Sequence, residues 1–203
     1  GQEPPFDSPR AVAYPASRMG AIALVRQVMR DTAWNKQATT AWLTQPTGQE
    51  PPRASAALAA LAPCLPKSGA RALPFVVECS DEHAVLHTKG LLDEAGWIGW
   101  CIASGLEFRE LDAVVATRLS LVVPLDFAKA PDLTNPRRAE QISLRELGTW
   151  ACSPMNPALL AERGVTMALT THRLKDRGDL HARLCTAAEH GLSADAALAA
   201  LTT

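Results

Sequence analysis

The chain has 203 residues, of which 47% are hydrophobic, and a formal net charge of −1 at pH 7. This length suffices for one compact domain with a sizeable core. The balance of acids and bases gives no basic surface for nucleic acid or for an anionic membrane, so proteins and small molecules are the expected partners. No run reaches the roughly 20 apolar residues of a membrane-spanning helix, and no secretory signal is visible, so the cellular compartment stays unknown.

Residues 1–53 are expected to form an irregular N-terminal segment around one helix. Proline is frequent in its first part. Apolar side chains recur at helical spacing over about residues 17–34, with Ser17 as a possible N-cap. Residues 44–53 are rich in Pro, Gly and Gln, which predicts a flexible connection to a second domain, residues 54–203.

In the second domain, four short apolar runs alternate with helical patterns. Continuous apolar runs predict parallel strands with both faces covered, joined by right-handed crossovers. The pattern alone fits either a doubly wound open sheet or a barrel. The expected strands are 73–78, 97–103, 119–125 and 164–170, and the expected helices are 54–65, 81–95, 107–115, 180–190 and 193–201.

Local signals place several helix ends. Ser80 or Asp81 is a possible N-cap for the helix that Gly96 ends. Ser143 and Glu146 have the spacing of a capping box, which predicts a further helix from this point.

Cysteine and tryptophan side chains are expected in the core. The five cysteines are odd in number and form no CxxC pair, which favours buried, reduced thiols over a disulfide framework or a zinc site. Trp97 and Trp100 flank the second expected strand, and core packing explains them better than a ligand cage.

From Leu73 onward the chain resembles the metal-dependent amidohydrolase superfamily, especially its imidazolonepropionase- and prolidase-like members. Gly164–Thr170 is similar to the last barrel strand of that family, and Gly191–Thr202 to its closing helix, GLS-x-x-x-AL-x-x-x-T. The resemblance implies an α/β fold that is part of a (β/α)8 TIM-like barrel, with about four parallel strands and flanking helices.

The resemblance also implies where a metal site would lie. In the superfamily, one or two divalent metals at the C-terminal mouth of the barrel lower the pKa of a bound water. Their ligands include a His-x-His, histidines that end the fifth and sixth strands, and an aspartate that ends the eighth. This sequence contains no His-x-His, and the matching strand ends hold Glu78, Ser104 and His172. Serine is a poor ligand, so the substitutions predict that hydrolysis by the family's mechanism is lost.

The candidate site residues are Glu78, Ser104, Asp126 and His172, each at or just after the end of an expected strand, with Lys175 in a loop over the same mouth. In a barrel the first four converge where ligands bind. A carboxylate–imidazole pair of Glu78 and His172 would bind a metal or transfer a proton, and His172 and Asp126 are the catalytic candidates. Alternatively, these groups are hydrogen-bonded remnants of an inactive site, and Lys175 is solvated.

Two functions follow from these alternatives. In the first, the chain is a non-catalytic amidohydrolase-like domain without a cofactor and with a structural or partner-supporting role in a larger protein. In the second, it is a hydrolase of amide or lactone bonds, in which Glu78, Asp126 and His172 hold zinc or another divalent metal with help from further chain or a partner. Four barrel strands leave two open edges, and we expect the remainder of the barrel or a second copy of the chain to cover them.

Overall fold

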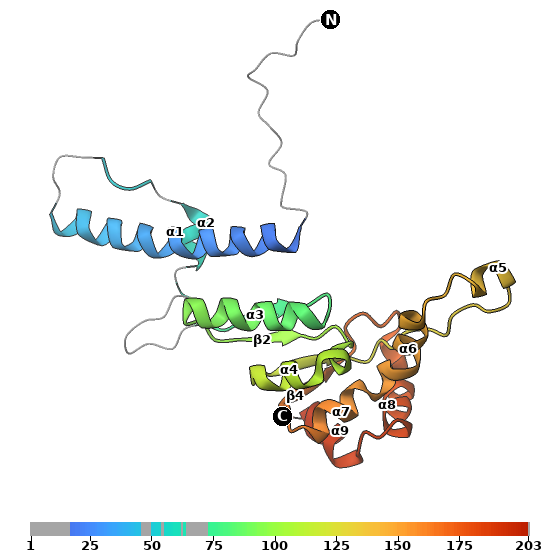
Figure 1. Cartoon of the computed structure of the whole chain (residues 1–203). Helices are drawn as coiled ribbons and strands as arrows, with labels where there is room; N and C mark the ends of the chain where they lie inside the picture. Colours follow the sequence, from blue (N-terminus) through green and yellow to red (C-terminus); the bar gives the residue numbers. More distant parts are fainter. Residues whose placement is uncertain (1–16, 46–49, 54, 62, 64–72, 203) are drawn as a thin grey trace, which may run out of the picture. The chain divides into compact units, whose positions relative to one another are not determined.

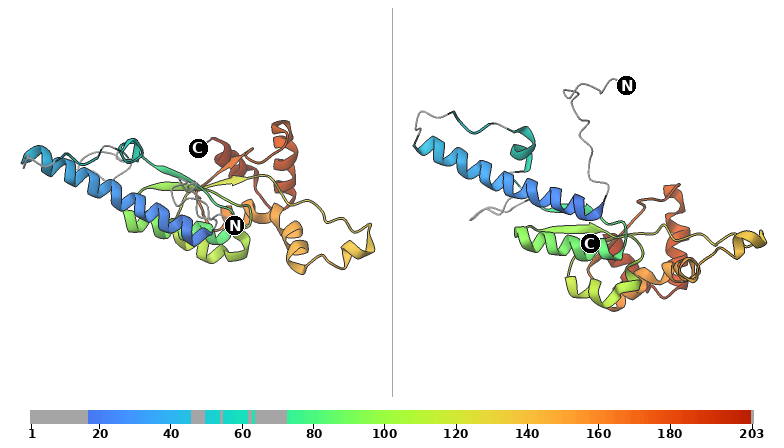
Figure 2. Two further views of the ribbon diagram at one scale, coloured as in Figure 1. Left: turned by 90° about the horizontal axis from the view of Figure 1, so that it is seen from above. Right: turned by 45° about the horizontal axis from the view of Figure 1, so that its top comes forward.

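The computed structural model describes residues 17–45, 50–53, 55–61, 63 and 73–202. The chain divides into two compact units, Gly1–Leu65 and Pro66–Thr203 (Figures 1 and 2). The predictions for residues 1–16, for part of the connection and for Cys64 lie outside the described residues.

The first unit contains α1 (Arg18–Thr44) and α2 (Ala56–Leu61). Ser17 caps α1 as predicted, because its side chain accepts a hydrogen bond from the Gly20 amide at 3.1 Å. The helix runs to Thr44 rather than ending near residue 34. Its second half lacks a regular apolar stripe, but no glycine or proline lies between Gly20 and Pro46 in the sequence, so no strong helix breaker ends the helix where the periodicity fades. Our predicted domains separated α2 from α1, whereas both helices lie in the first unit.

The second unit is built on one parallel sheet. Its strand order is β1-β2-β3-β4, the order of the sequence, and all three pairings are parallel. An order without reversal is that of a barrel segment, whereas a doubly wound sheet reverses at a switch point. The four predicted strands are confirmed as β1 (Phe75–Glu78), β2 (Gly99–Ile102), β3 (Leu121–Pro124) and β4 (Met167–Thr170).

Helices connect the strands (Figure 1). The Asp81 side chain accepts a hydrogen bond from the Ala84 amide at 2.9 Å, Gly96 ends that helix with a φ of 64°, and both bonds of the Ser143–Glu146 capping box are present, so these caps are confirmed. The helices are α3 (Glu82–Ala95), α4 (Leu111–Thr117), α5 (Pro136–Ala139), α6 (Leu144–Cys152), α7 (Asn156–Glu162), α8 (Leu180–Glu189) and α9 (Ala194–Thr202), with short 3-10 turns η2 (Glu107–Glu110), η3 (Ser153–Met155) and η4 (Arg177–Asp179).

The hydrophobic core lies between the sheet and these helices. Alternate strand residues face it, because successive side chains of a strand point to opposite sides. Two of the five cysteines belong to it, whereas Cys152 is half-buried and Cys185 exposed, so the expectation of buried cysteines is wrong for these two. One cluster consists of Cys79, Val85, Cys101, Ala103, Val114, Leu121, Val123 and Leu160, and a second of Leu125, Phe127, Ala187 and Leu192.

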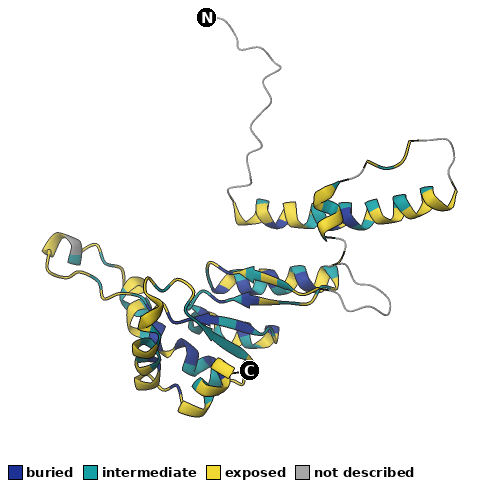
Figure 3. Ribbon diagram, turned by 180° about the vertical axis from the view of Figure 1, so that it is seen from behind, coloured by how far each residue is buried: buried dark blue, intermediate teal, exposed yellow. Residues whose placement is uncertain are grey.

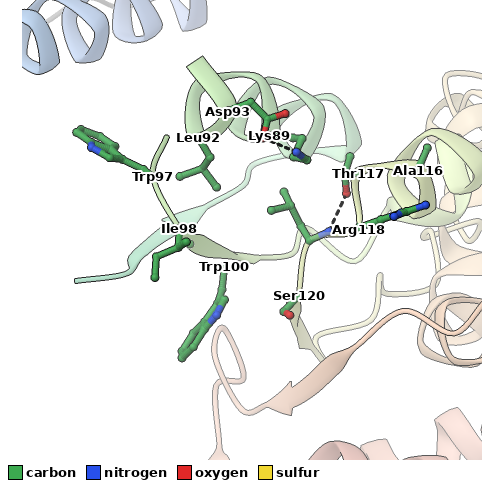
Figure 4. A pocket seen from close by; sticks show the side chains of 12 residues that line it. Lys89, Leu92, Asp93, Trp97, Ile98, Trp100, Ala116, Thr117, Arg118 and Ser120 are labelled. Carbon is green, nitrogen blue, oxygen red and sulfur yellow. Dashed lines mark hydrogen bonds and ion pairs between the residues drawn. The ribbon is translucent and has the colours of Figure 1, made fainter. Parts of the chain in front are cut away.

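The other face of the sheet is partly open. Val76 of β1 is 54% exposed and Trp100 of β2 is 49% exposed, and Figure 3 shows exposed positions along these strands. Trp100 projects from β2 away from Leu92 of α3 (Figure 4). Trp97 is partly buried and stacks on Phe75 with ring centroids 4.1 Å apart, whereas the expectation of core packing is wrong for Trp100. The prediction that both sheet faces are covered is therefore wrong for β1 and β2 within the described residues, whereas β3 is largely buried on both faces.

Candidate functional site

The mouth of the sheet brings together side chains from its two outer strands. Glu78 is the last residue of β1, and His172 follows β4. The His172 Nε2 atom lies 3.0 Å from the Glu78 Oε1 atom, although 94 positions separate the two residues along the chain. Because β2 and β3 lie between the outer strands, the contact spans the mouth of the sheet.

Arg173, which is not among the predicted site residues, binds the same carboxylate oxygen of Glu78. Its Nε and Nη2 atoms donate to Glu78 Oε1 at 3.3 and 3.0 Å. Its guanidinium also donates to two main-chain carbonyls, that of Cys79 at 3.2 Å and that of Ser104 at 3.4 Å. The arginine therefore joins the ends of β1 and β2 to the segment after β4. Its position next to His172 in the sequence was the available signal.

The backbone of Arg173 is unusual. Its φ is 69°, in the left-handed region that non-glycine residues rarely adopt. Directly before it, the His172 amide donates to the Thr170 Oγ1 atom at 3.1 Å, which tightens the turn after β4. The bonds of the guanidinium across the mouth offset the strain of this conformation.

Both neighbours favour the ionised form of Glu78. The hydrogen bond from His172 is the larger cause, and that from Arg173 the next, of a Glu78 pKa below its ordinary value. A carboxyl group whose pKa is lower in the folded than in the unfolded state stabilises the fold at pH values above its unfolded-state pKa. This contribution disappears as the pH falls through the folded pKa.

We expect Arg173→Ala to raise the pKa of Glu78 toward its ordinary value, because the variant removes the guanidinium donor. The measurement is an NMR titration of the side-chain carboxyl carbon of Glu78. Lys175→Ala is the matched control, since Lys175 is exposed and makes no hydrogen bond or ion pair within the described residues. A wild-type Glu78 that titrates like a glutamate in an unfolded peptide would contradict the assigned contacts.

Ser104 belongs to a hydrogen-bond network with the buried Glu107 carboxylate. Its amide and its hydroxyl both donate to Glu107 Oε1 at 2.7 Å. The Glu107 carboxylate is fully buried and also accepts from the Gly105 amide at 3.0 Å and from Asn156 Nδ2 at 2.9 Å. Asn156 in turn accepts from the Phe108 amide at 2.8 Å. Ser104 thus stabilises the turn after β2.

The other two candidates do not join the pair of Glu78 and His172. Asp126 and Lys175 are both exposed. Within the residues that the structure describes, neither side chain makes a hydrogen bond or an ion pair. Of the five candidates, the structure therefore brings two into direct contact.

The residues at the mouth do not fit a divalent metal. In the described ranges, no three His, Cys, Asp or Glu side chains lie close enough to hold one. The carboxylate with the best position, Glu78, already accepts hydrogen bonds from a guanidinium, whose positive charge repels a metal cation. The His172 Nε2 atom already contacts the Glu78 carboxylate, so a metal could be coordinated by this imidazole through Nδ1.

Comparisons with known proteins identify the fold. No protein-family model matches the chain, and no curated protein matches its sequence. The structure is similar to the crystal structure of an amidohydrolase from Thermotoga maritima MSB8, with a TM-score of 0.66 and 19% sequence identity over 93% of this chain. The chain thus shares the fold of part of that protein, and its four parallel strands in sequence order are those of part of a TIM-like barrel.

The chain spans 44% of the length of that amidohydrolase. Four strands are half of the eight that close such a barrel, so the second unit is a partial barrel. None of the helices in the described part is long and apolar enough to cross a membrane.

Proposed function

We propose that this chain is a non-catalytic, amidohydrolase-like domain with a structural, partner-supporting role in a larger protein or assembly. One observation carries the proposal: the guanidinium of Arg173 binds the carboxylate of Glu78 at 3.0 Å, at the mouth where a metal would have to bind. The arginine supplies a fixed positive charge there. It holds the strand ends together but cannot ionise a water molecule as a metal does.

The partly open sheet supports the partner-supporting role. β1 and β4 are edge strands, whose free N–H and C=O groups are suited to pairing with further strands. The exposed Val76 and Trp100 side chains lie on the face that is the interior in a closed barrel. The remainder of the barrel or a second copy of the chain would pair with both edges and bury this apolar face.

The alternative, a metal-dependent hydrolase of amide or lactone bonds, needs Glu78, Asp126 and His172 to share one ion. Asp126 makes no hydrogen bond or ion pair in the described part of the chain, and Glu78 is bound by Arg173. A partner would have to displace the guanidinium and supply the missing ligands. The contacts therefore favour the non-catalytic role.

The test is metal analysis by mass spectrometry, on protein produced with added zinc and manganese, together with its mass in solution. We expect far less than one metal ion per chain, because the donor set is incomplete. Arg173→Ala shows whether the guanidinium alone excludes the metal. A wild-type chain with close to one ion, lost in Glu78→Ala and His172→Ala, would overturn the proposal. A dimer mass would show that two copies assemble, as expected if a second copy covers the sheet.

A further inference from the structure

A cavity lies away from the mouth, in the shell of the second unit. The segment after β3, the α6–η3 region and α8 line it, and its volume is about 580 Å³ (Figure 1 labels α6 and α8). This volume is within the range of small-molecule sites. The buried side chains of Phe127 and Pro154 form part of its wall.

The cavity also borders the apolar side of α6. None of the residues of this helix is buried, and its Trp150 side chain, which lines the cavity, is 43% exposed. An indole ring beside an apolar wall offers a large contact surface with little loss of conformational freedom when a ligand binds. Trp150, Phe127 and Pro154 are therefore suited to an apolar or aromatic group.

The charged residues that line the cavity are all basic. They are Lys129 from the segment after β3 and Arg183 from α8, with His190 at the end of α8, and no acidic residue lines it. Neither Lys129 nor Arg183 makes an ion pair or a hydrogen bond in the described ranges. Arg183 is partly buried, and a partly buried cation without a partner is stabilised by a bound anion.

His190 adds to this side of the cavity. Its Nδ1 atom lies 2.8 Å from the Thr186 carbonyl oxygen and therefore carries the hydrogen of that bond. Its other ring nitrogen, Nε2, makes no hydrogen bond in the described part of the chain. It is thus available to a ligand, as an acceptor or, when protonated, as a third positive group.

We propose that this cavity binds a small organic carboxylate with an apolar body. Arg183 and Lys129 bind the carboxylate, since the planar guanidinium donates two parallel hydrogen bonds to it. Phe127, Pro154 and Trp150 contact the apolar body. The site is independent of the mouth and does not rest on the proposed non-catalytic role.

The experiment is isothermal titration calorimetry of the full chain with 2-naphthoate and with the neutral 2-naphthalenemethanol, which has the same ring system. We expect one naphthoate per chain, bound at least about tenfold more tightly than the alcohol, because only the acid engages the cations. Octanoate tests whether an aliphatic body suffices, and 2-naphthyl phosphate tests the choice of carboxylate. Equal affinity of acid and alcohol, no saturable binding of naphthoate, or tighter binding of the phosphate would overturn the proposal.

Variants locate the site on the chain. Arg183→Gln is expected to weaken naphthoate binding about tenfold or more and to leave binding of the alcohol unchanged. Lys129→Gln, on a different segment, is expected to have a smaller effect in the same direction. Arg177→Gln is the matched control, because this exposed arginine of η4 does not line the cavity. Thermal unfolding checks that each variant is folded. Unchanged naphthoate affinity in a folded Arg183→Gln variant would contradict the assignment.

Discussion

Replacement of Glu107 with alanine is expected to lower the free energy of unfolding by about 3–5 kcal/mol, the usual effect of breaking a buried, charge-assisted network. The carboxylate is fully buried and accepts four hydrogen bonds, two from Ser104 and one each from Gly105 and Asn156. The alanine variant leaves these donors without an acceptor in the protein interior. Two of them are main-chain amides, which cannot turn away without opening the turn after β2.

Urea unfolding of the wild type and of two variants measures this effect. The slope of the unfolding free energy against urea concentration is held at one value for all of them. Glu107→Gln is expected to lose less than Glu107→Ala, since the amide keeps one acceptor oxygen but presents a donor to the remaining N–H groups. Glu110→Ala is the matched control in the same element. Its side chain is exposed and its effect should stay within about 0.5 kcal/mol. A loss below about 1 kcal/mol for Glu107→Ala would show that the network does not hold this turn.

The network around Glu107 also shows which property of Ser104 could be predicted from the sequence and which could not. Ser104 was predicted at the mouth because it follows β2, and it does lie at that strand end. Its hydroxyl, however, binds a carboxylate three positions further along, and that carboxylate binds Asn156, 49 positions away in the sequence. Local spacing predicts which end of the sheet a residue occupies. It does not predict which partner takes its hydrogen bonds.

The charged residues at the mouth were also only partly predictable from the sequence. Glu78 and His172 could be placed together from the sequence, because the ends of parallel strands meet at one edge of the sheet. Arg173 lies next to His172 in the sequence, but this position does not indicate that its side chain reaches Glu78, since no local pattern indicates a left-handed backbone at a non-glycine residue. The neighbouring Lys175, which the sequence offered as a ligand contact, stays exposed.

The strands themselves were predictable because their apolar runs are short and bounded by helical patterns. Their order was not, since right-handed crossovers fit a doubly wound sheet as well as a barrel. The burial of their two faces was not. An apolar run looks the same whether its second face is covered by helices or faces the interior of a barrel. Trp100 was therefore expected in the core, whereas nearly half of it is exposed on the partly open face.

The second large effect is expected for Leu160→Ala, which should lower the free energy of unfolding by about 2–5 kcal/mol. Leu160 lies on α7, is fully buried and packs in the cluster that joins the sheet to α3 and α4. The surroundings have little freedom to fill the cavity, because Pro157 and the hydrogen bonds of Asn156 hold the start of the same helix. Leu144→Ala is the matched control, since Leu144 is also helical but 86% exposed. A loss similar to that of the control would mean that the core relaxes into the space.

The two effects are expected to be coupled, because α7 carries both Leu160 and the Asn156 amide that binds Glu107. Because Leu160→Ala lets α7 shift, it already weakens the hydrogen bond from Asn156 to the Glu107 carboxylate. Glu107→Ala then removes less stabilising free energy than it does in the wild type. The double variant should therefore lose at least about 0.5 kcal/mol less than the sum of the two single losses. If the losses add, α7 keeps its position when Leu160 is truncated, and the buried network alone positions this helix against the turn after β2.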